Sequence, residues 1–203
     1  MIDPITLAAL GAVLLATSRK PTAAELAQLS GVGVDDDGAL PFIVDGKVAL
    51  SGSRGHQEPI YVVAAHPSGW ESTRFGPWTY KQLTDNGVGV FNPMPRRYWP
   101  AMRITCELAA PLRPAGVLLS CGWRCPALND ALKDGPVSSS VPGSFHMTAR
   151  ALDFFDRNAA KAADGTWGPS AALDKMRDNA IASGQWCEII RNQKGGYLHL
   201  ARL

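Results

Sequence analysis

The stretch Ser144-Phe-His-Met-Thr-Ala-Arg-Ala-Leu-Asp153 decides how the rest of this chain is interpreted. It places an imidazole, His146, seven residues before a carboxylate, Asp153. Both groups are ordinary ligands for a borderline metal such as zinc. A second histidine, His199, lies in an apolar, strand-like segment near the end of the chain. We therefore expect His146, Asp153 and His199 to converge on one metal ion.

A simpler explanation of the same residues stays open at this point. Seven residues also make about two helical turns, so His146 and Asp153 would share one face of a helix by chance. His199 would then be a histidine of the core with its hydrogen bonds satisfied.

Composition limits the class of protein. The 203 residues allow one domain plus an extension, or two small domains. A hydrophobic content of 46% with 19% charged residues is typical of a folded protein. The net charge is +2 and no run of Lys and Arg occurs, so we expect no nucleic-acid partner.

The four cysteines are too few for a disulfide scaffold and lack the paired spacing of a zinc ribbon. Three alternatives remain: one or two disulfides, four buried thiols, or an iron–sulfur site with irregular spacing.

Residues 1–95 are expected to be an N-terminal extension or accessory region. The apolar run at 5–16 covers 12 residues, whereas a membrane-spanning helix needs about 20. Packing on the protein or a partner is favoured there over membrane contact or export. The pair Asp45-Gly46 predicts a hairpin turn within residues 41–50. His56 and His66 are interpreted as solvated loop side chains.

Residues 96–203 show clearer patterns. Apolar residues recur at Trp99, Met102, Cys106 and Ala109, which predicts a helix over residues 97–113. The other expected elements are a buried strand at 116–120, one or two helical turns at 126–132, a helix at 170–183 ending at Gly184, and a terminal hairpin over 186–201.

Three motifs in this half occur in a recognisable order. They are Ser120-Cys-Gly-Trp-Arg-Cys-Pro-Ala-Leu-Asn129, the opening stretch at 144–153, and Tyr197-Leu-His199. Together they resemble the zinc D-alanyl-D-alanine carboxypeptidase family, peptidoglycan peptidases whose relatives include D-Ala-D-Ala dipeptidases and many phage endolysins. The family pattern is S-G-Y-R-S-P-x-L-N, then S-x-H-x-x-G-x-A-x-D, then aromatic-x-H. The match covers about residues 96–203, with one inserted residue after Ser120.

The resemblance implies an α+β fold, with a small antiparallel sheet that carries a zinc site and is backed by helices. It implies that His146, Asp153 and His199 bind zinc and leave a fourth position for water, as a catalytic zinc requires. It further implies that Arg124 faces the substrate, where a guanidinium can hold a carboxylate or carbonyl. Ser144 is assigned to substrate binding with it.

Two departures from the family pattern stand out. The glycine of H-x-x-G is Ala149 here, which costs about 1 kcal/mol if that position needs a positive φ. The acidic residue that the family carries shortly before its last histidine is absent between residues 192 and 198. Glu188 is the nearest acid. If residues 192–195 form a four-residue hairpin loop, Glu188 pairs directly with His199 and shares its face.

The sequence thus predicts a zinc-dependent peptidoglycan peptidase in which Glu188 is the catalytic proton shuttle. The substrate would be a peptide bond of peptidoglycan, in the periplasm, the cell wall or a phage virion. An alternative is a structural or binding protein on the same fold, such as a virion or tail component that contacts its partners through residues 1–95. A cell-wall-binding module is a third hypothesis. We also expect residues 96–203 to fold without the first half.

Overall fold

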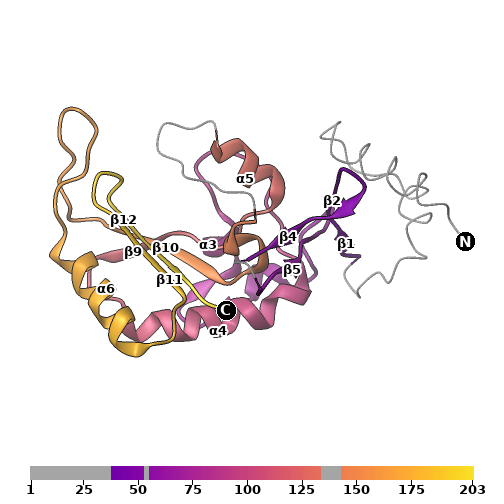
Figure 1. The fold of residues 1–203 in the computed structure, drawn as a ribbon, viewed down its shortest axis with the longest axis horizontal. Coiled ribbons are helices and arrows are strands. Elements are labelled where there is room, and N and C mark those ends of the chain that lie inside the picture. The colour runs from indigo at the N-terminus through magenta and orange to yellow at the C-terminus, as the bar shows by residue number, and fades with distance from the viewer. Residues whose placement is uncertain (1–37, 53–54, 134–142) are drawn as a thin grey trace, which may run out of the picture.

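The computed structural model describes residues 38–52, 55–133 and 143–203, and they form a mixed α+β fold (Figure 1). Its centre is a four-stranded antiparallel sheet with the strand order β11-β12-β10-β9. The strands are β9 (Val117–Cys121), β10 (Ala151–Asp156), β11 (Glu188–Asn192) and β12 (Tyr197–Ala201). The α+β fold with a small antiparallel sheet that the sequence predicts is therefore confirmed.

The helices pack mainly on one face of this sheet. Both α4 (Trp99–Ala109) and α6 (Ala171–Ser183) contact β10, and Figure 1 shows them along one side of the strands. The other helical elements are α3 (Tyr80–Thr84), α5 (Pro126–Lys133), η1 (Trp70–Ser72), η2 (Arg96–Tyr98), η3 (Ala110–Leu112) and η4 (Phe145–Thr148).

Alternation along the strands separates a core face from a site face. Leu152, Phe154, Leu198 and Leu200 are fully buried, and all four belong to the main core cluster. Successive strand residues point to opposite faces, so Asp153, which lies between Leu152 and Phe154, points away from the helices. The chain therefore directs polar side chains toward the face that α4 and α6 leave uncovered.

The first half contributes pairs of very short strands. They are β1 (Leu40–Pro41) with β6 (Tyr61–Val62), β2 (Ile43–Val44) with β3 (Lys47–Val48), β4 (Leu50–Ser51) with β5 (Glu58–Pro59), and β7 (Arg74–Phe75) with β8 (Trp78–Thr79). The hairpin turn predicted at Asp45-Gly46 is confirmed: both residues have positive φ, 50° and 72°, as a two-residue hairpin turn requires.

The second-half elements are largely as predicted. The helix stripe is confirmed, since Met102, Cys106 and Ala109 are fully buried in α4. Helix α6 ends at Gly184, whose φ of 62° is the left-handed conformation expected of a C-terminal glycine. The apolar run at 5–16 lies outside the described residues.

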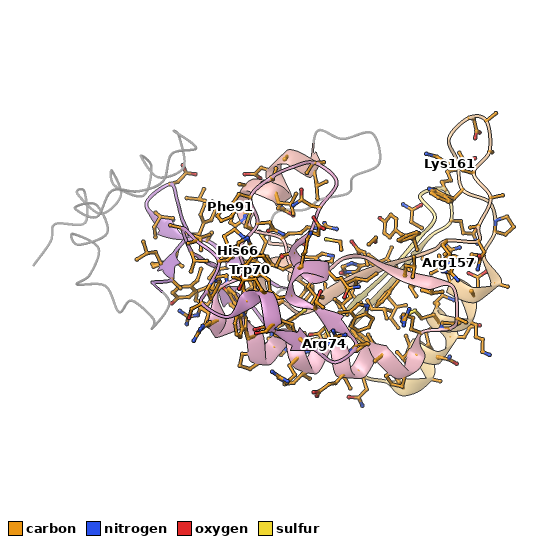
Figure 2. All side chains as sticks on the ribbon, turned by 180° about the vertical axis from the view of Figure 1, so that it is seen from behind. His66, Trp70, Arg74, Phe91, Arg157 and Lys161 are labelled. Carbon is orange, nitrogen blue, oxygen red and sulfur yellow. The ribbon has the colours of Figure 1, made fainter. Side chains whose placement is uncertain are left out.

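The structure corrects the interpretation of His66 as a solvated loop side chain, because its ring packs among aromatic side chains. Its ring stacks on Trp70, with centroids 4.4 Å apart, and meets Phe91 edge to face at 4.9 Å (Figure 2). Its Nδ1 lies 3.1 Å from the hydroxyl of Tyr80. Because the neighbouring rings shield it, burial lowers the pKa of His66.

One core spans both halves of the chain. Phe75, Tyr80 and Leu83 from the first half are fully buried in the same cluster as Trp123 and Phe154. A division at residue 95 would cut through this cluster. Leu83 also fixes the chain within the motif at 120–129, because its carbonyl accepts a hydrogen bond of 2.8 Å from the Trp123 N–H.

Among the described residues, no helix has the length and apolar character to span a membrane.

Leu83→Ala should destabilise the whole protein by about 2–5 kcal/mol, because it opens a cavity in the shared core. Ile181→Ala, a control on the exposed side of α6 where the side chain is 60% exposed, should change stability by about 0.5 kcal/mol or less. Both free energies of unfolding are measured by denaturant titration. Equal values for the two variants would show that the first half is energetically separate from the sheet.

Candidate metal centre

Three residues from neighbouring strands lie in a row across the site face of the sheet. Asp153 on β10 pairs directly with His199 on β12 and with Cys121 on β9. Directly opposite residues share a face, with Cβ atoms about 4.5–5.5 Å apart. The row exists because the register of β9 changes between Asp153 and Phe154, where Ser120 is skipped in the pairing. This irregularity brings Cys121 rather than Ser120 opposite the carboxylate.

His146 reaches this row from the turn η4. The hydroxyl of Ser144 caps the turn by accepting a hydrogen bond from the His146 N–H. Ala149 ends it in the left-handed conformation, with a φ of 60°. A glycine adopts this conformation without strain, whereas Ala149 adopts it at a steric cost. A turn followed by a strand also rules out the alternative that His146 and Asp153 share one face of a helix.

Two imidazole nitrogens and the carboxylate of Asp153 form a small triangle at the centre of the site. His146 Nε2 lies 3.3 Å from His199 Nδ1 and 3.2 Å from an oxygen of Asp153. His199 Nδ1 lies 2.7 Å from the other oxygen of Asp153. Ligands placed about 2.0–2.1 Å from a tetrahedral zinc ion lie about 3.3 Å apart, so this triangle approaches one face of such a coordination sphere.

The hydrogen bonds of both histidines suit metal binding. His146 Nδ1 donates a hydrogen bond to the carbonyl of Gly122 at 2.6 Å. The lone pair of His146 is therefore on Nε2, the atom that belongs to the triangle. The opposite nitrogen of His199, Nε2, donates to Glu188 at 3.0 Å. A partner on the far nitrogen orients the imidazole and increases its basicity as a ligand.

The charge states follow from burial and neighbours. Burial, together with the charge of Arg124, lowers the pKa of His146 to about 4. Burial alone would raise the pKa of Asp153, but His146, His199 and Arg124 outweigh it and hold that pKa well below its usual range. Burial acts downward on His199 too, yet hydrogen bonds and charge from Asp153 and Glu188 raise its pKa. The site therefore keeps an ionised carboxylate beside a neutral, buried imidazole.

Arg124 lies inside the site rather than apart from it. Its guanidinium forms an ion pair with Asp153 and donates a hydrogen bond from Nε to Cys121 Sγ at 3.0 Å. The side chain is only 14% exposed. The residue that we predicted to bind substrate is thus paired with the carboxylate of the candidate centre. Ser144, the other predicted substrate-binding residue, is buried and caps the turn of His146.

Glu188 reaches His199, but by a register that differs from the prediction. Glu188 pairs with Ala201, and His199 pairs with Ile190. The hairpin loop covers residues 193–196, one residue later than expected. Moving the loop by one residue shifts the strand pairing by two, which preserves the face because the side-chain period is two. Glu188 therefore lies diagonal to His199, on the same face, and its side chain is 44% exposed.

Cys121 was not predicted as a site residue. Cys121, His146 and Asp153 form a group whose ligand atoms all lie within 4.8 Å of one another, the one such cluster of metal-ligating side chains in the described part of the chain. The described residues thus contain a group that can hold a metal ion, and His199 adjoins it through the triangle. The signal for Cys121 was present in the sequence as the inserted residue after Ser120. All four cysteines are free thiols.

Residues of the first half hold the turn that carries His146. The Ser51 hydroxyl donates to the Ser144 carbonyl at 2.6 Å, and Arg150 forms an ion pair with Glu58. Gly52 also donates a backbone hydrogen bond of 2.8 Å to the carbonyl of Gly143. The segment predicted to be an accessory region therefore fixes one ligand of the candidate centre.

Comparison of the chain with protein-family models, with curated proteins and with solved structures gave no match in any of the three.

The two histidines should make opposite contributions to the pH dependence of stability in metal-stripped protein. His199, with a raised folded pKa, adds stability as the pH falls through that pKa toward 6.5. His146, with a folded pKa of about 4, removes stability as the pH falls from 6.5 to 4, because only the unfolded state then binds the proton. His146→Gln should reduce the loss of stability that occurs as the pH falls below 6.5. His199→Gln should remove the gain in stability that occurs as the pH falls toward 6.5.

Denaturant titrations of the wild type and both variants across this pH range would measure the two effects. A wild-type stability that rises as the pH falls from 6.5 to 4, and is unaltered by His146→Gln, would contradict the neutral, buried state of His146.

Proposed function

We propose that this protein is a zinc-dependent peptidase that hydrolyses peptide bonds of peptidoglycan, of the D-Ala-D-Ala carboxypeptidase or endopeptidase type. The observation that carries the proposal is the triangle of His146 Nε2, His199 Nδ1 and the Asp153 carboxylate, with separations of 2.7–3.3 Å. The motif resemblance supplies the substrate class. The α+β fold is the one that the resemblance implies, and the closeness of these three residues supports the proposal.

The residues present fit zinc. Two imidazoles and one carboxylate are a donor set of catalytic zinc sites, and both imidazoles have a hydrogen-bond partner on the opposite nitrogen. A zinc ion held there would polarise the scissile carbonyl and lower the pKa of bound water toward neutrality. Calcium or magnesium would instead favour a shell of oxygen ligands, which this site does not offer.

The chain's own residues have separable roles in this proposal. Asp153, ionised and paired with Arg124, sets the position of the centre between β12 and the η4 turn. Arg124 can hold a substrate carboxylate or carbonyl through those N–H groups that its bonds to Asp153 and Cys121 leave available. Glu188 is the most exposed acid at the site, so it would take a proton from the attacking water and pass it to the leaving amine.

A second candidate function is a structural or binding protein on the same fold, such as a phage virion or tail component. Two observations favour it. Glu188 accepts a hydrogen bond from His199. This contact suits a carboxylate that orients the imidazole as well as it suits a general base. The guanidinium of Arg124 is largely occupied by Asp153 and Cys121. Such a protein would bind the metal and lack turnover, whether it acts in the periplasm, in the cell wall or on a virion.

The purified full-length protein should contain one zinc ion per chain and release peptides from purified sacculi. His146→Ala and His199→Ala should lose most of the zinc and all measurable hydrolysis, because each removes one corner of the triangle. Elemental analysis and chromatography of the released peptides measure the two effects. Zinc content that is unchanged in both variants would exclude this site. Zinc-loaded wild type without hydrolysis of sacculi or D-Ala-D-Ala peptides would favour the structural protein.

Glu188→Gln and Glu188→Ala separate a general base from an orienting residue. Glutamine can still accept the hydrogen bond from His199 but cannot take a proton. If Glu188 is the base, both variants should retain zinc and lose about 10²–10⁴-fold in hydrolysis rate. If Glu188 only orients His199, the glutamine variant should stay close to wild type while the alanine variant loses zinc affinity. Rates on sacculi and zinc-binding titrations distinguish the two results.

A further inference from the structure

Cys121 occupies a position that the fold creates specifically beside the ligand carboxylate. The register shift in β9 leaves Ser120 out of the pairing and places Cys121 directly opposite Asp153. In a regular pairing without this shift, Ser120 would lie opposite Asp153. A bulge re-aims a side chain at the end of a strand, and here it aims a thiol at the candidate metal centre.

The sulfur atom lies within reach of the ligand atoms. Cys121 Sγ belongs to the group with His146 and Asp153 whose ligand atoms are all within 4.8 Å of one another. His146 and Asp153 are common to this group and to the triangle with His199. His199 is not part of the group with Cys121, so binding of one zinc ion by all four residues requires the sulfur to move closer to the His199 imidazole.

Arg124 provides an alternative interaction partner for the Cys121 sulfur. Its Nε–H donates to Cys121 Sγ at 3.0 Å, while the same guanidinium pairs with Asp153. A hydrogen bond from a cation to sulfur stabilises a thiolate whether or not the thiolate is bound to a metal. The thiol is therefore held beside the centre by a residue that also contacts a ligand.

We propose that Cys121 is a fourth, displaceable ligand of the metal held by His146, Asp153 and His199, and that it keeps the centre closed until substrate arrives. The inference rests on the metal centre proposed above. On binding, the sulfur–metal bond forms and the thiol proton is released to solvent. On opening, that bond breaks, a water molecule or substrate oxygen takes the position, and the sulfur stays near Arg124 or regains a proton.

The consequence concerns regulation of the proposed activity. Four protein ligands make a closed site of the structural kind, whereas hydrolysis needs an open position. Cys121 would thus reduce the resting activity of the enzyme, and its removal should leave three ligands that still hold the metal. Cys121→Ser should bind the metal more weakly, because hydroxyl oxygen is a poorer ligand than thiolate, and should hydrolyse sacculi several-fold faster than wild type.

Cobalt(II) loading of the full-length protein tests the proposal without relying on activity, because a thiolate bound to Co²⁺ gives a charge-transfer band in the near ultraviolet. Wild type, Cys121→Ser, Cys121→Ala and Cys187→Ser are titrated with Co²⁺, and bound metal is counted by equilibrium dialysis. Cys187 is an exposed free thiol on the surface, which makes its variant the matched control. Circular dichroism verifies that each variant is folded.

The expected result is one bound Co²⁺ per chain in all four proteins, with the band present in wild type and Cys187→Ser and absent in both Cys121 variants. Bound Co²⁺ without the band in wild type, or a band that persists in the Cys121 variants, would overturn the role of Cys121 and leave the three-ligand centre intact. A wild type that binds no Co²⁺ and no Zn²⁺ would overturn the centre and with it the proposed function.

Discussion

Asp153 is the group on which the site depends, because it is a buried carboxylate on a central strand of a small sheet. A buried ionised carboxylate is costly unless charges and hydrogen bonds surround it. Here Arg124, His146 and His199 all direct nitrogen atoms toward it, from three different parts of the chain. Each of those parts must therefore be placed accurately for the folded state to form, and a metal ion would add a further positive charge at the same point.

The first half of the chain takes part in this placement. Leu83 fixes the segment that leads to Arg124, and Ser51 fixes the turn that carries His146. Both contacts lie far from the metal ligands in the sequence. The candidate centre thus relies on residues that no motif marks, and contacts from outside residues 96–203 help to hold it in place.

The extra residue in the pairing of β9 with β10 shows how one position in the sequence can change which side chains meet. In a regular strand pairing, one additional residue would turn every later side chain to the other face. The bulge absorbs the insertion locally, so the strand before it keeps its core residues and the segment after it still delivers Arg124. The residue that gains a new position is Cys121, and a thiol is a softer ligand than the hydroxyl that it replaces opposite Asp153.

Periodicity and turn residues determined most of the local structure in the second half. Helical spacing predicted α4 and α6, and the motif residues His146, Asp153 and His199 were identifiable because their order and spacing are distinctive. Register and cross-chain contacts were decided only in the folded molecule. The loop before β12 begins one residue later than expected, since local turn preferences constrain a hairpin loop only to within about a residue.

The sequence by itself determined which residues can bind a metal, because ligand chemistry belongs to the side chain. The tertiary structure alone decided that Cys121 faces Asp153, that Glu188 lies diagonal to His199, and that the first half shares the core. Each of these depends on how separate segments align in space. That alignment is set by packing and hydrogen bonding summed over the whole chain, and a local pattern does not contain it.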